Sequence, residues 1–466
     1  NTHTTQKGNE MEKTPRTPMR TVEAEKRKNN FEKFLLGYTK EEAVKEANRC
    51  YNCVRPRCSK ACPIHNYIPD FMEAVAEEDF AGAYDIISER SCMPEICGTV
   101  CPHEDQCEGS CIQGIKGEPV AIGAVERFVA EWAAENGLTK EAKPEANGKK
   151  AACVGAGPAS LACAQKLAEK GYEVTIYEKY DYIGGILAWG IPSYRLDRKA
   201  IENKAETLKG LGVEFKFNEN ITSIDKLRKE YDAVFIGTGA PNSNVMNIPG
   251  EDLKGVYAAD DFLTKINLSP IEADGRRHFE GCGKRVLIIG GGNVAMDAAR
   301  DAVRLAQVEK VTIVYRRSEE EMPACGEELK HAKEEGIEFM TLTNPVEFVG
   351  ENGVLTKAVC AVMELGEPDA SGRRRPVETD KRVTLDIDTA VLALGFSNDP
   401  TIGNATADLA ADKWGCFEVN EKQATTAENV YAGGDAVTGA STVVKAMKAG
   451  MAAAEAIDRK LRLGIE

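Results

Sequence analysis

Of the chain's 15 cysteines, nine lie between residues 50 and 111, in spacings that suit iron–sulfur chemistry. The first run has the spacing C-x2-C-x4-C-x3-C-P and consists of Cys50, Cys53, Cys58, Cys62 and Pro63. The second run has the spacing C-x5-C-x3-C and consists of Cys101, Cys107 and Cys111. Thiolates spaced this closely can each bind one iron of a cubane. The two runs therefore predict two 4Fe-4S clusters.

In two-cluster ferredoxins the last cysteine of a run binds the other cluster. Applied here, this exchange assigns one cluster to Cys50, Cys53, Cys58 and Cys111. The other cluster receives Cys62, Cys101 and Cys107. Its fourth ligand stays open among Cys92, Cys97 and a non-cysteine group.

A glycine turn follows the short apolar stretch 151–154, and a helical pattern and a second apolar stretch come after it. Gly155 permits the tight turn, Gly157 lets the backbone approach a pyrophosphate, and Glu178 ends the second stretch where it can bind a ribose hydroxyl. A tight turn without a ligand would not need this ordered set of strand, helix and acid. We predict dinucleotide binding by Gly155, Gly157, Pro158, Ala159, Ser160, Glu178 and Lys179.

A second turn of the same design begins after residues 285–289, and its predicted binding residues are Gly290, Gly292, Asn293, Val294 and Ala295. Its second strand ends in Arg316 and Arg317 instead of an acid. Guanidinium groups pair with the 2′-phosphate of NADP(H), which a carboxylate would repel. The arginine pair therefore favours NADP(H) over NAD(H), and the alternative interpretation of the pair is a solvated strand end.

A third glycine element, near the C-terminus, combines Gly434 and Asp435 with a helix that starts near Ser441, Thr442 and Val443. The carboxylate can bind a ribityl hydroxyl, and the helix N-terminus favours negative charge on a reduced flavin. Two strand–glycine returns, Gly237-Thr238-Gly239 and Gly395, mark where the chain would cross between domains.

These elements predict an α/β protein with a helical iron–sulfur domain followed by two Rossmann-like domains. The expected domains are residues 1–148 for the clusters, 149–275 with 396–466 for FAD, and 276–395 for NADP(H). The NADP domain is therefore inserted in the FAD domain. Within the first domain, Thr39 is expected to cap one helix, and Gly137 to end another.

Structural zinc is the main alternative for the cysteines, since His65 and His103 lie nearby. We favour iron–sulfur clusters because zinc gives no electron-transfer rationale beside two redox nucleotide domains. Disulfides are disfavoured in a reducing compartment. No CxxC or CxxxxC pair occurs after residue 111, so thiol exchange at the flavin is not expected.

The 466 residues carry a net charge of -15, which argues against nucleic acid or an anionic membrane as partner. The first 30 residues are polar, without the apolar core of a signal peptide. No apolar run approaches the ~18 residues of a membrane span. We therefore expect a cytoplasmic protein.

The chain resembles the small (beta) subunit of NADPH-dependent glutamate synthase and its relatives. The resemblance rests on segments such as CPIHNYIPDFM, PEICGTVCPHEDQCEGSC, GGILAWGIPSYRL, VYRRSEEEMPA and YAGGDAVTGASTVVKAM. DFLTKINL, GEPDASGRRRP and DKWG are more similar to the large subunit of the electron-bifurcating NADH-dependent ferredoxin:NADP oxidoreductase. The expected partners are then a smaller flavin and iron–sulfur subunit and ferredoxin, or a glutamate synthase large subunit, in a hetero-oligomer.

The resemblance also implies site residues. It makes Glu126 the fourth ligand of the second cluster and Cys97 a non-ligand, whereas Cys92 departs from the family's usual asparagine. It places Gly185, Gly190, Ile191 and Pro192 near the flavin. The implied reaction transfers hydride from NADPH to FAD and single electrons to the clusters, with no side-chain acid or base. A subunit whose nucleotide sites are vestigial remains a further alternative.

Overall fold

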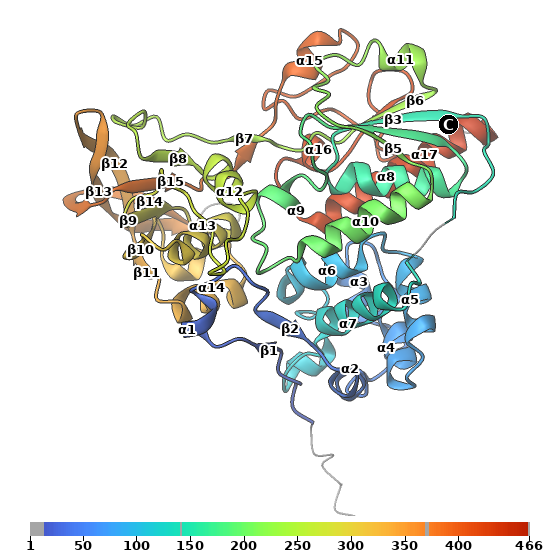
Figure 1. Cartoon of the computed structure of the whole chain (residues 1–466), viewed down its shortest axis with the longest axis horizontal. Coiled ribbons are helices and arrows are strands. Elements are labelled where there is room, and N and C mark those ends of the chain that lie inside the picture. Colours follow the sequence, from blue (N-terminus) through green and yellow to red (C-terminus); the bar gives the residue numbers. More distant parts are fainter. Residues whose placement is uncertain (1–13, 140–141, 369–371, 465–466) are drawn as a thin grey trace, which may run out of the picture. The chain divides into compact units, whose positions relative to one another are not determined.

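The computed structural model describes residues 14–139, 142–368 and 372–464. The chain divides into two compact units (Figure 1). Of the described residues, the first unit comprises 14–20, 37–98 and 102–136, and the second comprises 21–36, 99–101, 137–139, 142–368 and 372–464. None of the helices in the described ranges has both the length and the apolar character that a bilayer crossing requires.

The first unit is helical, as expected. Its principal helices are α2 (Lys40–Ala47), α3 (Arg57–Ala61), α4 (Ile68–Ala76), α5 (Phe80–Ser88), α6 (Pro94–Val100) and α7 (Ile122–Glu135). Thr39 and Glu42 form the capping box that starts α2, which confirms the predicted cap. Phe71, Met72 and Val125 are fully buried in the core between these helices. This packing holds the cysteine loops, which have little regular structure of their own.

A parallel five-stranded sheet with the order β17-β6-β3-β4-β5 lies within the described part of the second unit. Its strands are β3 (Lys150–Val154), β4 (Glu173–Tyr177), β5 (Glu214–Lys216), β6 (Ala233–Ile236) and β17 (Val430–Ala432). The neighbouring helices are α8 (Pro158–Glu169), α10 (Arg198–Gly210) and α17 (Val443–Leu463). Since β17 pairs with β6 after almost 200 intervening residues, the chain leaves this sheet and returns to it.

The intervening residues form a second parallel sheet with the order β11-β10-β9-β15-β8. Its strands are β8 (Val256–Ala258), β9 (Arg285–Ile289), β10 (Lys310–Tyr315), β11 (Glu338–Thr341) and β15 (Thr389–Leu392). Its helices are α12 (Ala259–Asn267), α13 (Asn293–Arg304) and α14 (Gly326–Glu334). Beside it lies an antiparallel sheet of β12 (Thr343–Glu351), β13 (Val354–Pro368) and β14 (Arg374–Asp386).

Short elements complete the described chain: α1 (Ala24–Arg27), α9 (Ile186–Trp189), α11 (Leu227–Glu230), α15 (Thr401–Ala405), α16 (Asp435–Thr438), β1 (Arg20–Thr21), β2 (Leu35–Gly37), β7 (Asn242–Ser243) and β16 (Phe396–Ser397). β7 and β16 pair with each other directly after the two predicted strand–glycine returns. The chain thus crosses between the two parallel sheets at these returns, as the glycine pattern indicates.

The structure differs from the expected domain boundaries at two places. β8 pairs with β15, so the second sheet begins before residue 275. Residues 21–36 belong to the second unit, because Phe31 and Phe34 are buried in the core around α13. Arg27 anchors this segment through ion pairs with Glu334 and Glu335.

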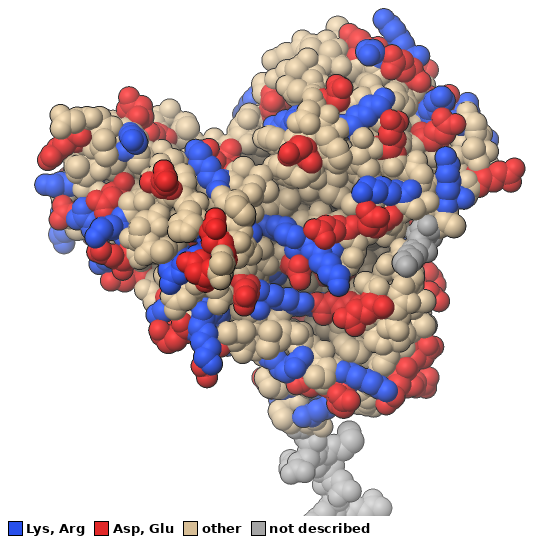
Figure 2. Space-filling view, in the orientation of Figure 1, with Lys and Arg blue, Asp and Glu red and all other residues tan. Residues whose placement is uncertain are grey.

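Charge is mixed over the surface. On the face shown in Figure 2, Lys and Arg side chains are interspersed with Asp and Glu, without a continuous basic stripe.

Candidate functional site

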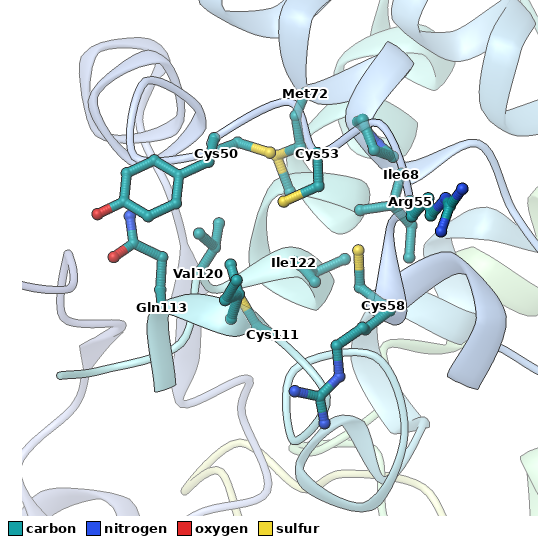
Figure 3. Close-up of a pocket in the computed structure, with 14 residues that line it drawn as sticks. Cys50, Cys53, Arg55, Cys58, Ile68, Met72, Cys111, Gln113, Val120 and Ile122 are labelled. Atoms are coloured by element: carbon teal, nitrogen blue, oxygen red, sulfur yellow. The ribbon is translucent and has the colours of Figure 1, made fainter. Parts of the chain in front are cut away.

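The four cysteines assigned to the first cluster line one cavity of the first unit (Figure 3). Cys50 and Cys53 lie on the loop between α2 and α3, Cys58 is in α3, and Cys111 comes from the second cysteine run. The rest of the wall is mainly apolar and includes Ile68, Met72, Val120 and Ile122. The structure therefore brings together the four thiols that the spacing assigned to one cluster.

The pKa of the Cys58 thiol is raised to about 11, mainly by burial and to a smaller extent by the nearby thiols of Cys111 and Cys50. Burial likewise raises the pKa of Cys50, with smaller contributions from Cys111 and Cys53. Without a metal these thiols keep their protons, so cluster binding must release them. Iron supplies the positive charge that compensates four adjacent thiolates.

A single zinc ion and a cubane need different arrangements of their protein ligands. In the described residues, no three histidine, cysteine or acidic side chains are positioned to hold one metal ion. Zinc needs its donors on one atom, whereas a cubane takes one thiolate at each iron. Of the two histidines of the zinc alternative, His103 packs against Gly123 and His65 is exposed. No disulfide joins any two cysteines of the described residues.

The predicted ligands of the second cluster lie in a more buried place. The Cys107 thiol and the Glu126 carboxyl, on α7, are 7% and 8% exposed. Burial raises the pKa of Cys107 well above its usual value, and Glu126 and Cys62 add to the effect. Burial alone raises the pKa of Glu126 to about 8. Ionised forms of a carboxyl and two thiols are unfavourable at this depth unless a cation balances their negative charge. The site is therefore suitable for a bound metal cluster.

The remaining cysteines of this region keep their roles as predictions. Cys101 directly follows α6. Its assignment to the second cluster stays a prediction. Cys97 is buried in α6 and contributes to the raised pKa of Cys62. Cys92 is buried as well.

The first glycine turn has the geometry that a dinucleotide requires. Gly155 has φ +88°, and a Cβ there would lie 2.7 Å from the Gly237 carbonyl oxygen. Gly157 precedes α8 without a side-chain cap, and Pro158 begins the helix, so N–H groups of the first turn stay available. Glu178 accepts hydrogen bonds from the backbone N–H groups of Ala156 (2.7 Å) and Tyr180 (3.0 Å).

A cavity next to this turn is lined by Gly155, Glu178, Lys179 and Thr238, all of them predicted binding residues. Its other lining residues, which sequence reasoning missed, include Asn220, Thr222 and Asp399 from loops and Thr401 at the start of α15. These residues carry no motif, because their place depends on how distant segments meet. Ser160 is fully buried, and its hydroxyl oxygen stands 2.3 Å from where a Cβ on Gly237 would be. The Ser160 side chain therefore packs inside the protein against Gly237 and does not face a ligand.

At the start of α17, polar atoms lack partners within the described chain. Thr442 precedes the helix without capping it and its hydroxyl is unpartnered, and the buried side-chain amide oxygen (Oδ1) of Asn398 accepts no hydrogen bond from the described residues. The Asn398 side-chain N–H donates to the carbonyls of Asp435 and Ala436, which fixes its orientation. Asp435 accepts from the Ser441 N–H at 3.1 Å, and burial raises its pKa to about 6. These groups suit a bound molecule with hydroxyl and amide groups, such as a flavin.

The segment 184–192 adjoins the first glycine turn. A Cβ on Gly185 would lie 3.3 Å from the Gly157 Cα, so these two turns touch. Further along, Arg198 donates to the carbonyls of Leu187 and Ile191 at 2.8 Å each and holds the segment that contains Gly190 and Pro192. The contact of Gly190, Ile191 and Pro192 with flavin stays a prediction.

The second glycine turn repeats the first. A Cβ on Gly290 would lie 2.3 Å from the Ala393 carbonyl oxygen, so this position excludes larger residues. Gly292 precedes α13 without a side-chain cap. Asn293 accepts from the Cys325 N–H at 2.9 Å and donates to its sulfur at 3.4 Å. Ala295 is fully buried, so it packs the helix against the sheet.

The arginine pair lies directly after β10. Arg316 is exposed, and the Arg317 Nε donates to the Arg374 carbonyl at 2.9 Å. Neither guanidinium takes part in an ion pair with a described acidic residue. Both positive charges therefore stay available at the strand end.

Comparison with known proteins accounts for almost the whole chain. Residues 27–138 match the family described as dihydropyrimidine dehydrogenase domain II, 4Fe-4S cluster. Residues 149–450 match the family described as pyridine nucleotide-disulphide oxidoreductase.

Two curated relatives are informative. The glutamate synthase [NADPH] small chain of Halomonas elongata is 36% identical over 93% of this chain and 94% of its own length. The NADP(+)-dependent formate dehydrogenase subunit beta of Moorella thermoacetica is 38% identical over 87% of this chain and 60% of its own length.

Among solved structures, Mycobacterium tuberculosis FprA in complex with NADPH has a TM-score of 0.57 at 21% identity. The similarity covers 67% of this chain and 84% of FprA. At this identity it supports the fold of the two parallel sheets.

Proposed function

The chain belongs to the family of glutamate synthase small chains and is an NADPH-dependent oxidoreductase that uses FAD and iron–sulfur chemistry; within this family, we propose that it is the large subunit of a bifurcating ferredoxin:NADP oxidoreductase. It moves electrons between NADP(H), FAD and two 4Fe-4S clusters. The observation that carries the electron path is the convergence of Cys50, Cys53, Cys58 and Cys111 on one cavity. The segments GEPDASGRRRP and DKWG favour the bifurcating type.

Bound FAD would accept a hydride and release electrons singly, which clusters require. The chain's own residues bind and orient the reactants. Gly157 and the start of α8 bind the first pyrophosphate, and Glu178 is placed for the ribose. Gly292 and the start of α13 bind the second pyrophosphate. No step calls for a side-chain acid or base.

The second candidate is a glutamate synthase small chain. It is favoured by the 36% identity to such a chain over 94% of that chain's length. In that role the partner would be a glutamate synthase large subunit. Nothing in this chain supplies an amidotransferase nucleophile, so a separate chain would have to provide it.

Two experiments test the proposal. Anaerobic NADPH should bleach the flavin absorbance of the purified chain, because hydride transfer needs only the bound nucleotide and FAD. A flavin that stays oxidised would instead favour the vestigial alternative, although the complete glycine turns argue against it. Isolation of the native complex should yield a smaller flavin and iron–sulfur chain. A glutamate synthase large subunit in its place would establish the second candidate.

The NADP(H) assignment predicts a selective defect in Arg316→Ala. This exposed guanidinium supports no other described residue through an ion pair, so its loss should act on the 2′-phosphate alone. We expect the KM for NADPH to rise about tenfold or more while that for NADH stays within about twofold. Steady-state kinetics with both nucleotides give the answer, and an equal loss for both would overturn the assignment. Arg317→Ala is a less specific variant, because Arg317 also holds the Arg374 carbonyl.

A further inference from the structure

The cavity of the first predicted cluster lies close to the surface of the first unit. The four cysteines that line it are all partly exposed. Two of the four predicted ligands of the second cluster, Cys107 and Glu126, are buried. Electron tunnelling slows steeply with distance, so an external partner exchanges electrons with the centre that it can approach most closely. Of the two predicted clusters, the first is therefore better placed to exchange electrons with another protein.

Exposed apolar side chains surround this cavity. Val54, on the loop between α2 and α3, is 97% exposed, and Tyr51 on the same loop is exposed as well. On the short helical turn at Ile112–Ile115, Ile115 is 63% exposed and Ile112 is also exposed. Tyr51 and Ile112 line the cavity itself. Exposed apolar groups that gather in one place are typical of a surface that binds another molecule.

Polar contacts hold these two segments against each other. The Gln113 side-chain N–H donates to the carbonyl of Arg49, directly before Cys50, at 2.6 Å. The Arg49 guanidinium donates in turn to the carbonyls of Glu118 at 2.7 Å and Pro119 at 3.2 Å. The exposed apolar side chains of both segments therefore form one apolar patch, which consists of Tyr51, Val54, Ile112 and Ile115.

Positive charge lies beside the apolar patch. Arg55, Arg57 and Lys60 are exposed, and none of them forms an ion pair with a described residue. Arg55 and Arg57 line the cavity, and Figure 3 shows Arg55 at its edge. Neither the loop between α2 and α3 nor α3 itself contains an acidic residue, whereas α4, on another wall, carries the exposed acids Asp70 and Glu73. The loop and α3 are therefore basic in a chain whose net charge is -15.

We propose that the apolar patch, together with Arg55 and Arg57, is the docking surface for a small one-electron carrier protein with an acidic face. This inference rests on the proposed function and assigns its exchange with a carrier to one cluster. A chain with a net charge of -15 repels an acidic partner, so uncompensated guanidinium groups beside the cavity steer that partner to the cluster. The apolar patch supplies the water-free centre of the contact. Contacts between redox partners are small and transient, which fits a surface built from two short segments.

Electron transfer from a reduced carrier to NADP+ tests this surface in the full chain, purified without oxygen. Two carrier molecules lose one electron each, and with one proton they convert one NADP+ to NADPH. The probe is a reduced two-cluster ferredoxin with an acidic surface, whose oxidation stopped-flow absorbance follows. Arg55→Glu with Arg57→Glu should lower the second-order rate constant about tenfold at low salt, and added salt should reduce this difference. Val54→Asn should lower it at every salt concentration, because this change alters no charge.

Lys229→Glu with Lys381→Glu is the matched control. Both lysines are exposed, on α11 and β14 of the second unit, and neither forms an ion pair with a described residue. The control changes the net charge by the same amount as the double arginine variant, so it should keep the wild-type rate constant. EPR spectra of both reduced variants should match the wild type, which shows that the clusters are intact. Equal rate constants for the two double variants would overturn the proposal.

Binding of the oxidised ferredoxin, measured by titration calorimetry at low salt, separates this proposal from the proposed function. Binding that weakens in the double arginine variant supports the surface even if NADPH fails to bleach the flavin, which would remove the proposed function alone. Unchanged binding in a chain whose flavin NADPH bleaches would remove the surface alone. Protection of residues 51–57 from hydrogen exchange by a glutamate synthase large subunit in the native complex would also overturn the carrier.

Discussion

The ligand most difficult to predict at the scale of single residues is Glu126. Cysteine spacing indicates seven cluster ligands, because their types and intervals are rare outside metal sites. A glutamate within a helix has no such signal, and only family resemblance pointed to Glu126. The structure adds its environment, a buried carboxyl with its pKa raised to about 8. Asn398 could not be predicted either, because its unpartnered side-chain oxygen is brought to the site only when distant segments meet, whereas Thr442 was predicted as part of the third glycine element.

Glu126→Ala should alter one cluster and spare the other. The variant removes the oxygen ligand, so one component of the reduced protein's EPR spectrum should change or disappear. The component of the cluster at Cys50, Cys53, Cys58 and Cys111 should stay. Glu135→Ala, at the exposed end of the same helix, is the control. Unchanged spectra would exclude Glu126 as the ligand and return the question to Cys92 and Cys97.

At the scale of elements, the close approach of α17 to α8 positions the start of α17 at the predicted flavin site. The contact depends on Gly450, where a Cβ would lie 2.0 Å from the Ala159 carbonyl oxygen. Since this obstacle is backbone, a larger residue must displace a helix. The sequence predicted both helices from their glycine and apolar patterns, but no pattern revealed that position 450 must be glycine.

Gly450→Val should therefore loosen α17 and reduce flavin retention. Overpacking of this kind typically costs ~1–3 kcal/mol, and here it also moves the start of α17. We expect a lower Tm and a lower flavin-to-protein ratio after gel filtration. Lys448→Val, at an exposed position of the same helix, introduces the same β-branched side chain without the contact. Equal flavin retention in the two variants would contradict this account.

α13 carries a buried acid whose ionisation should affect stability. Asp301 is fully buried, and neither carboxylate oxygen has a hydrogen-bond partner in the described chain. Burial, aided by Asp297, raises its pKa to about 7, while Arg304, Arg277 and Arg198 act in the opposite direction. Because the folded pKa exceeds the unfolded value of ~3.9, this group's stabilising contribution is lost as pH rises from about 4 to about 7.

Asp301→Asn removes that titration. The Tm of the variant minus that of the wild type should therefore increase between pH 5 and pH 8. Subtraction cancels groups that titrate in both proteins, including His331, whose pKa is lowered to about 4 by burial. A Tm difference that is constant over this range would show that Asp301 is not protonated in the folded protein.

At the scale of the whole molecule, the order of the cluster domain and the two nucleotide-binding domains along the chain was predictable. Several contacts between segments distant in sequence were not. The returns at Gly239 and Gly395 predicted an interrupted nucleotide domain, which the pairing of β17 with β6 confirms. The packing of Phe31 and Phe34 beside α13 had no sequence signal, because residues 21–36 are largely polar and lack a clear period. The pairing of β8 with β15 was missed because short strands are recognised only through their distant partners.

The central claim is that one polypeptide holds both a flavin and thiolate-bound cubanes. Its most direct test is the iron, acid-labile sulfide and FAD content of the chain purified without oxygen. The account predicts about eight iron atoms, about eight sulfides and one FAD per polypeptide. Stoichiometric zinc without sulfide, or a chain that holds iron but no flavin, would contradict it.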